Sequence, residues 1–429
     1  MSQPTICIII FIISLVLYIT NWIPMALASL LTLVAFVFAD CIDAGTALSG
    51  FANANTIVIA SMLVVAAGFN KTQFVDKMSK KIAKLSGGSM RKAWAGYILL
   101  TSLVAALIPS PMAAFAVVFP LCAGTCRAFD ESPSKYMFAL AVMCICFTYV
   151  FPFGNAIIRT EQNNGYFASY NMAQYVMKPT DWLVGRWPMA ILVWLWAFFV
   201  APRSSPAKPL VPINEDLFVK KTDKKVLPPV AEWAGVIIFF GVIVLMLLSS
   251  KLGVANWQIS TAGALMMVLF GTLQEKEAYR ALPFTVVFVY AGGLATGNAL
   301  VNTGAAEVVG KWLSAIVGNT TNSYVLGGLF FLVPFLLTQF MVNSSVVNLF
   351  TPLCLLTCSA LGANPIGPCL LVVTGAMTAF MTPLATPSMP MCMGVGGYDQ
   401  KALFKMGWLI SIILAASQIF WVMTIFPAF

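Results

Sequence analysis

A cluster of small polar residues interrupts the apolar sequence at Thr338-Gln-Phe-Met-Val-Asn-Ser-Ser-Val-Val-Asn-Leu-Phe-Thr-Pro-Leu353. The flanking segments, Tyr324–Leu337 and Val346–Leu361, are each shorter than the about 20 residues that a helix needs to cross a bilayer. We therefore predict a re-entrant hairpin over 324–361 whose tip, Val342–Ser345, is irregular backbone at membrane depth. Such backbone occurs only where protein buries it or where it lines a wet cavity. A single transmembrane helix, whose Asn and Ser side chains bond neighbouring helices, is the alternative.

The composition is that of an integral membrane protein. Of the 429 residues, 60% are hydrophobic and 9% are charged, which leaves too few polar residues for a water-exposed surface. Apolar runs of helical length recur from Ile6 to Pro427 without a long polar block, so we predict one membrane domain with no separate catalytic or regulatory domain. The N-terminal run lacks a basic leader, and we expect it to be retained.

The net charge of +9 is concentrated in two stretches. Of the 24 Lys and Arg residues, seven lie in Lys71–Lys92 and six in Arg203–Lys225, and both stretches adjoin hydrophobic segments. Basic loops beside transmembrane helices face the cytoplasm. We therefore place both stretches on the cytoplasmic side of the cell membrane and expect no nucleic-acid partner.

The first half of the chain contains a second interrupted hairpin. Pro109-Ser-Pro-Met112 divides the apolar run over 93–126, which predicts a hairpin that enters from the cytoplasm. Before it, Lys71–Leu85 has the spacing of a helix that lies in the membrane interface. After it, Phe151-Pro-Phe-Gly-Asn155 breaks a helix that we predict over 136–170.

The second half repeats this plan. The hairpin over 324–361 precedes a helix over 366–392 that breaks at Thr382-Pro-Leu-Ala-Thr-Pro387. Three pairs of prolines occupy corresponding places at offsets of 231 or 232 residues: Pro120 and Pro352, Pro133 and Pro365, and Pro152 and Pro383.

This correspondence predicts an all-α polytopic membrane protein built from two inverted repeats. We assign residues 1–200 and 232–429 to the repeats and 201–231 to a basic cytoplasmic linker. Each repeat has five crossings and one re-entrant hairpin, and the last crossings are predicted over Trp187–Val200 and Leu409–Ile425. Because five is odd, the halves have opposite orientations, which gives about ten crossings and two extracytoplasmic termini. The charges agree, since 19 Lys and Arg residues fall inside and four outside: Lys178, Arg186, Lys251 and Lys311.

The hairpin tips and helix breaks supply free backbone amides and carbonyls near the bilayer midplane, where transporters with inverted repeats bind substrate. Helix N-termini favour an anion, and carbonyls with Asn and Ser oxygens favour Na⁺. The predicted substrate-binding residues at these places are Asn343, Ser344, Ser345, Ser110, Asn155 and Thr386. A sodium ion is expected near four of them: Asn343, Ser344, Ser110 and Asn155.

Arg159 is a further candidate, because it follows Asn155 by four residues and so shares its helical face. A charged side chain within the membrane usually marks a functional site, and a guanidinium can bind a carboxylate at two points. An ion pair with Glu161, or a position at the membrane edge near the polar stretch Thr160–Asn164, is the alternative.

The sequence contains few residues that could carry out catalysis. The chain has no His, its ten Cys residues show no CxxC spacing, and its Gly-rich stretches lack the Lys-Ser/Thr sequel of a phosphate loop. The carboxylates fall almost entirely in predicted loops. We therefore expect neither enzymatic activity, nor a zinc site, nor a cofactor other than a coupling ion.

The arrangement resembles the divalent-anion:sodium symporters, the INDY-type dicarboxylate and tricarboxylate carriers of the ion-transporter superfamily. The likeness covers Ala67-Gly-Phe-Asn-Lys-Thr72, the turns at Thr296-Gly297 and Asn302-Thr303-Gly304, both hairpins, both proline breaks and Gly396-Gly397-Tyr398. It implies a homodimer that transports a small organic anion by an elevator-like movement of the hairpin domain.

In that family each hairpin tip carries Ser-Asn-Thr, which binds a substrate carboxylate and helps to cage sodium. Here the second tip, Val342-Asn343-Ser344, matches in kind, whereas the first tip, Pro109-Ser110-Pro111, lacks Asn and Thr. The departure leaves both sodium symport and anion exchange open. The layout also resembles that of transporters of sulfate, citrate, gluconate or arsenite. An inorganic oxyanion is therefore an alternative substrate, and an anion channel is an alternative activity.

Overall fold

The computed structural model describes residues 2–20, 22–74, 77, 89–108, 110–213, 227–282, 284–317, 321–383, 386 and 388–429. Within these ranges the chain forms helices and no β-strand, which confirms the all-α prediction. Most of the interface helix predicted over 71–85 and the centre of the linker over 201–231 lie outside the described residues.

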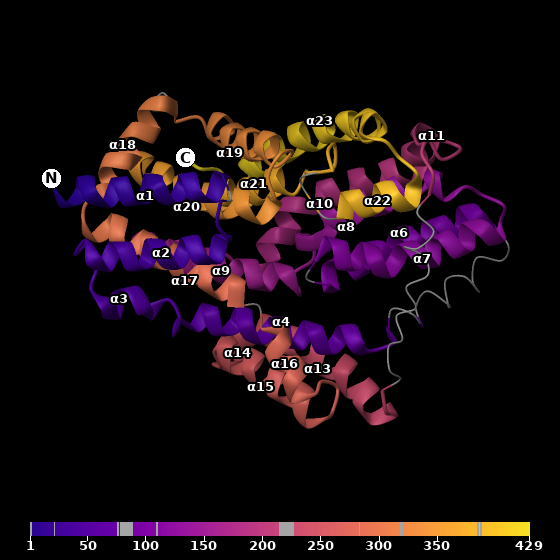
Figure 1. Ribbon diagram of the computed structural model, residues 1–429, viewed down its shortest axis with the longest axis horizontal. Helices are drawn as coiled ribbons and strands as arrows, with labels where there is room; N and C mark the ends of the chain where they lie inside the picture. Colours follow the sequence, from indigo (N-terminus) through magenta and orange to yellow (C-terminus); the bar gives the residue numbers. More distant parts are fainter. Residues whose placement is uncertain are drawn as a thin grey trace.

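The first half contains these helices (Figure 1): α1 (Gln3–Thr20), α2 (Met25–Phe38), α3 (Ala44–Ser49), α4 (Ala54–Lys71), α6 (Met90–Leu107), α7 (Pro111–Ala128), η1 (Pro133–Lys135), α8 (Met137–Cys146), η2 (Phe147–Tyr149), α9 (Asn155–Ser169), α10 (Pro179–Leu195), η3 (Trp196–Val200) and α11 (Ala201–Ser204). The prediction that the last span begins at Trp187 is wrong. Pro179 suits the first helical turn, and the carboxylate of Asp181 accepts a hydrogen bond from the Lys178 amide at 2.8 Å.

The second half contains α13 (Pro229–Leu247), α14 (Ser249–Leu252), α15 (Asn256–Leu269), α16 (Glu275–Ala281), α17 (Phe284–Asn302), α18 (Ala305–Val317), α19 (Ser323–Leu337), α20 (Asn343–Leu361), α21 (Ile366–Ala376), α22 (Ser388–Gly396) and α23 (Gln400–Ile425). The final helix begins at Gln400 instead of the predicted Leu409. Asp399 caps it by accepting a hydrogen bond from the Ala402 amide at 2.8 Å.

Six helical stretches of the described residues are long and apolar enough to cross a membrane: Ala44–Lys71, Pro111–Ala128, Pro179–Ser204, Pro229–Leu247, Asn343–Leu361 and Gln400–Ile425. The expectation that every hairpin arm is too short to span is therefore wrong for α7 and α20, which have 18 and 19 residues. The polar residues at the start of α20 extend the helix because Asn and Ser suit a first helical turn.

Helices of the two halves pack against each other. In Figure 1, α4 lies beside α13, α15 and α16 along the lower edge of the molecule, and α2 lies beside α17. At the C-terminal end of α4, Lys71 forms an ion pair with Glu277 at 2.6 Å, and Lys77 forms one with Glu232 at 2.9 Å. The two halves therefore form one packed helical body.

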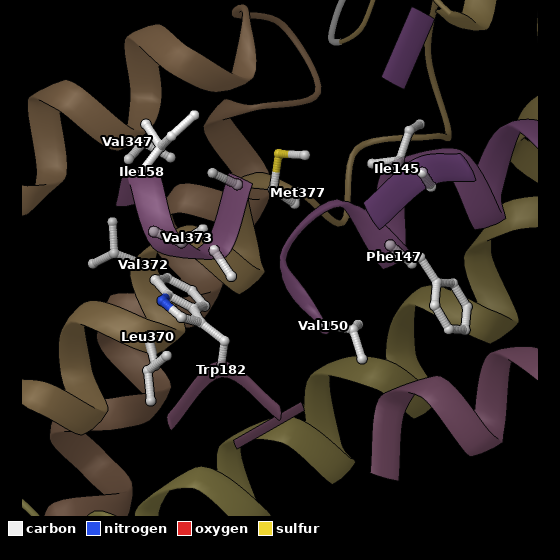
Figure 2. Close-up of a cluster of buried hydrophobic side chains, with 14 of the residues drawn as sticks. Ile145, Phe147, Val150, Ile158, Trp182, Val347, Leu370, Val372, Val373 and Met377 are labelled. Atoms are coloured by element: carbon white, nitrogen blue, oxygen red, sulfur yellow. The ribbon is translucent and has the colours of Figure 1, made fainter. Parts of the chain in front are cut away.

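The core around the broken helices is apolar and draws on both halves. Figure 2 shows the indole of Trp182, on α10, beside Leu370, Val372 and Val373 of α21. Trp182 is fully buried, and its Nε1 donates a hydrogen bond to the Thr160 hydroxyl of α9 at 2.9 Å. Helix α10 thus fixes α9 and α21, which lie next to the two breaks.

The first break depends on one glycine. Gly154 precedes α9 with a φ of +56°, and a Cβ atom there would lie 2.5 Å from the Ala106 carbonyl oxygen of α6. A positive φ combined with a ψ of −116° is a conformation that residues other than glycine rarely adopt, and the neighbouring backbone atom has little room to move. The break is therefore packed directly against the end of α6.

We expect Gly154→Ala to lower the free energy of unfolding by about 2–4 kcal/mol, because it adds backbone strain and a steric clash. Gly253→Ala is the matched control, since Gly253 has a φ of +66° but no atom within 4 Å of the added Cβ. The control should lose about 1 kcal/mol. Thermal unfolding of both variants in detergent measures the difference, and equal losses would show that Gly154 is not tightly packed.

Candidate functional site

One cavity of about 470 Å³ is lined by all seven predicted site residues: Ser110, Asn155, Arg159, Asn343, Ser344, Ser345 and Thr386. They come from the residue before α7, the start of α9, the start of α20 and the break between α21 and α22. The volume is typical of sites for small molecules. Both tips and both breaks therefore contribute to one cavity.

In the first half, Asn155 connects the helix break to the tip. Its side chain is 6% exposed, and its Nδ2 donates a hydrogen bond to the Ile108 carbonyl at 3.2 Å, just after the end of α6. Ser110 lies in the same tip and caps α7 by accepting a bond from the Ala113 amide at 3.4 Å. The first turn of α9 leaves backbone N–H groups without helical partners beside the cavity.

In the second half, Asn343 likewise connects the hairpin tip to the helix break. Its Oδ1 accepts hydrogen bonds from the hydroxyls of Thr338 at 3.0 Å and Thr386 at 3.2 Å, and its Nδ2 lies 3.4 Å from the Met377 sulfur. No side chain caps the start of α20. The first amides of that helix, including that of Ser344, are therefore free of helical partners at the cavity wall.

Arg159 is a buried cation held between the two halves. It is 5% exposed, its Nη1 donates to Gln162 Oε1 at 3.0 Å, and its Nη2 donates to the Thr351 hydroxyl of α20 at 2.9 Å. Its Nε has no hydrogen-bond partner among the described residues. Glu161 instead accepts a bond from Asn256 Nδ2 at 2.6 Å. The alternative in which Arg159 pairs with Glu161 does not match these contacts.

The cavity presents a positive charge in largely apolar surroundings. Arg159 is the one charged side chain among the described residues that line it, and apolar side chains such as Met25, Leu63 and Val347 form much of the wall. A cation in low-dielectric surroundings attracts an anion more strongly than it would in water. With the open amides of α9 and α20, the arrangement favours a small anion.

Sequence reasoning missed several polar residues of the cavity. Gln162 and Asn348 line it, as does Tyr149. Gln162 follows Arg159 by three residues and Asn348 follows Ser344 by four, so helical spacing was an available signal. Tyr149 lies in an apolar run and gave no such signal.

Arg186 was expected in a loop on the outer side of the membrane, and the loop position is wrong. Because α10 begins at Pro179, Arg186 lies within the helix and is fully buried. Arg159 is therefore not the only basic residue near the broken helices within the described part of the chain.

Comparison with known proteins is consistent with this geometry. A profile of the citrate transporter family, CitMHS, matches residues 15–374. The chain is 31% identical over 175 residues to "Uncharacterized transporter sll0640" of Synechocystis, a match that covers 41% of this chain and 28% of the relative. It is 20% identical over 448 residues to "Sodium-dependent dicarboxylate transporter SdcS" of Staphylococcus saprophyticus, which covers 94% of this chain and 83% of the relative.

Two solved structures share the fold. The YdaH transporter of Alcanivorax borkumensis aligns with a TM-score of 0.63 at 13% identity, covering 88% of this chain and 86% of that one. MtrF of Neisseria gonorrhoeae aligns with a TM-score of 0.62 at 13% identity, covering 98% and 94%. The matched family and its relatives are transporters, which confirms the predicted resemblance, the multi-pass membrane location and the absence of an enzymatic role. The chain belongs to the citrate transporter family.

Proposed function

We propose that this chain is a secondary active transporter of a small organic anion, either a dicarboxylate or a tricarboxylate. The observation that carries the proposal is the cavity that Arg159 shares with the open amides of α9 and α20. The Nε of Arg159, which has no hydrogen-bond partner among the described residues, and these amides are N–H donors of the kind that carboxylate oxygens accept. Arg159 balances the ligand charge, while Asn343, Ser344 and Ser345 orient it.

We further propose that residues 1–200 and 232–429 form inverted repeats that move the cavity by an elevator-like step. The pairs α6–α7 and α19–α20 would be the two re-entrant hairpins. Two facts support this: their tips reach one cavity, and each tip is bonded to a nearby part of its own half, through Asn155 and Asn343. Both termini would be extracytoplasmic, and the transporter would be a homodimer.

A sodium ion fits best as a co-transported substrate beside the second break. The hydroxyls of Thr338 and Thr386 each lie within hydrogen-bonding distance of Asn343 Oδ1, and the Thr338 hydroxyl is 2.9 Å from the Ala376 carbonyl oxygen. Nearby, the buried Oε1 of Gln339 has no hydrogen-bond partner among the described residues. Uncharged oxygens of this kind suit Na⁺. The relatives named sodium-dependent dicarboxylate transporters support the same coupling ion.

A thermal-shift screen tests the proposal directly. We expect succinate or citrate to raise the unfolding temperature of the purified protein as its concentration increases, and Na⁺ to enlarge the shift. A ligand that binds only the folded state stabilises it by about 2.7 kcal/mol at one hundred times its dissociation constant. A shift with sulfate or arsenite alone would make an inorganic oxyanion the substrate. No shift with any anion would contradict the anion site.

A further inference from the structure

Arg186 is a fully buried cation that the proposed site does not use. Its Nη2 donates a hydrogen bond to the Cys146 carbonyl at 3.3 Å and lies 3.7 Å from the Met189 sulfur. Its Nε and Nη1 have no partner among the described residues. The ion pairs found in the described chain involve Lys71, Lys77 and Lys135, so none of them neutralises Arg186.

A buried guanidinium without a carboxylate is energetically costly. Two features compensate it in part. Cys146 is the last residue of α8, so its carbonyl lies at the negative end of the helix dipole. The guanidinium carbon also lies 6.0 Å from the centroid of the Tyr149 ring, within the range of a cation–π interaction. Neither feature supplies a full negative charge.

The position of Arg186 relates it to the anion cavity. Tyr149 lines that cavity together with Arg159, and Arg186 contacts the same ring. The indole of Trp182 lies 5.5 Å from the Tyr149 ring and is itself fully buried. Figure 2 shows apolar side chains around Trp182 and along the first break. The Tyr149 ring and apolar side chains therefore separate Arg186 from the cavity, and such low-dielectric surroundings screen its charge only weakly.

We propose that Arg186 is a fixed second cation behind the anion site, and that it makes the cavity select dianions and trianions over monoanions. The inference rests on the proposed function and adds the charge of the substrate to it. Arg159 can bond one carboxylate directly. Arg186 does not touch the ligand, but each negative charge of the ligand is attracted to it, so a dianion gains about twice what a monoanion gains.

The test compares ligands of nearly equal shape and different charge. Succinate and its monomethyl ester are titrated into the purified full-length protein by calorimetry at mildly alkaline pH, where every free carboxyl group is ionised. Arg186→Gln removes the cation, and Arg186→Lys keeps it. Met189→Glu leaves Arg186 in place but sets a carboxylate beside its Nη2, and Met189→Gln is the uncharged control.

We expect Arg186→Gln and Met189→Glu each to reduce the affinity ratio of succinate to the monoester about tenfold, as the loss of a unit charge at about 12 Å would at an effective dielectric constant of about 20. Arg186→Lys and Met189→Gln should keep the ratio within about threefold of the unmodified protein. If Arg186→Gln does not fold, Met189→Glu decides, because it retains the arginine.

Two failures are distinguishable. An unchanged ratio in Met189→Glu, with succinate still bound by the unmodified protein, would overturn the role of Arg186 and leave the proposed function standing. Absence of succinate and citrate binding by the unmodified protein would overturn the proposed function itself. Equal loss of affinity for both ligands in the Arg186 variants would make Arg186 a structural cap of α8.

Discussion

Arg159→Gln is expected to weaken dicarboxylate binding about tenfold to a hundredfold. A hydrogen bond to a charged group contributes about 1.5–3 kcal/mol to the binding free energy. The substitution removes both the positive charge and the planar set of N–H donors of the guanidinium. The effect should be large because Arg159 is buried, is the one charge among the described lining residues, and has a free Nε. Calorimetric titration of the purified variant with succinate or citrate measures the loss.

Arg159→Lys separates charge from geometry at the same position. It should recover part of the affinity, since an ammonium keeps the charge but lacks the planar fork that bonds a carboxylate twice. The expected order is Arg, then Lys, then Gln. A Gln variant that unfolds at the normal temperature and binds the anion normally would exclude Arg159 from the site.

Asn343→Ala is expected to reduce both the Na⁺ dependence and the anion affinity at least tenfold. Asn343 Oδ1 is the acceptor that Thr338 and Thr386 share, so its removal takes one oxygen from the proposed ion site and leaves the two hydroxyls with the Ala376 and Ala379 carbonyls as their acceptors. A polar ligand group lost from a buried site costs about 1–3 kcal/mol. The same change disconnects the start of α20 from the break after α21. Thermal-shift titrations with Na⁺ and with succinate measure the two effects separately.

Asn364→Ala is the matched control. The Oδ1 of Asn364 also accepts a hydrogen bond, in this case from the Ile366 backbone amide at 3.0 Å, but Asn364 does not line the cavity. The control should leave both affinities within about twofold, because it disturbs only a local cap. If the Asn343 and Asn364 variants behave alike, the Asn343 oxygen has no specific part in ion or anion binding.

The sequence indicated residues that line one cavity, because polar residues are conspicuous in an apolar chain. Asn343, Ser344 and Ser345 interrupt a hydrophobic run, and a membrane helix has few other reasons to contain them. Asn155 and Arg159 share a helical face by their spacing of four, and both line the cavity. The proposed roles of these residues in binding stay predictions until the variants are measured.

Helix boundaries were harder to predict, and the wrong start of α10 assigned the buried Arg186 to a loop. Uniformly apolar sequence carries little periodicity, so capping by residues such as Asp181 and Asp399 decides where helices begin. Starting α10 at Trp187 put Arg186 in a loop, whereas the observed start buries it. Its contact with Tyr149 joins residues 37 apart in sequence, which no local pattern reveals.

The initial rate of labelled succinate or citrate uptake into proteoliposomes, measured against concentration under an inward Na⁺ gradient, tests the transport claim most directly. The account predicts a saturable rate, accumulation above the external concentration, and loss of both in Arg159→Gln. A flux that rises linearly with concentration and stops at equilibrium, or uptake unchanged in Arg159→Gln, would contradict it; the first result would indicate an anion channel.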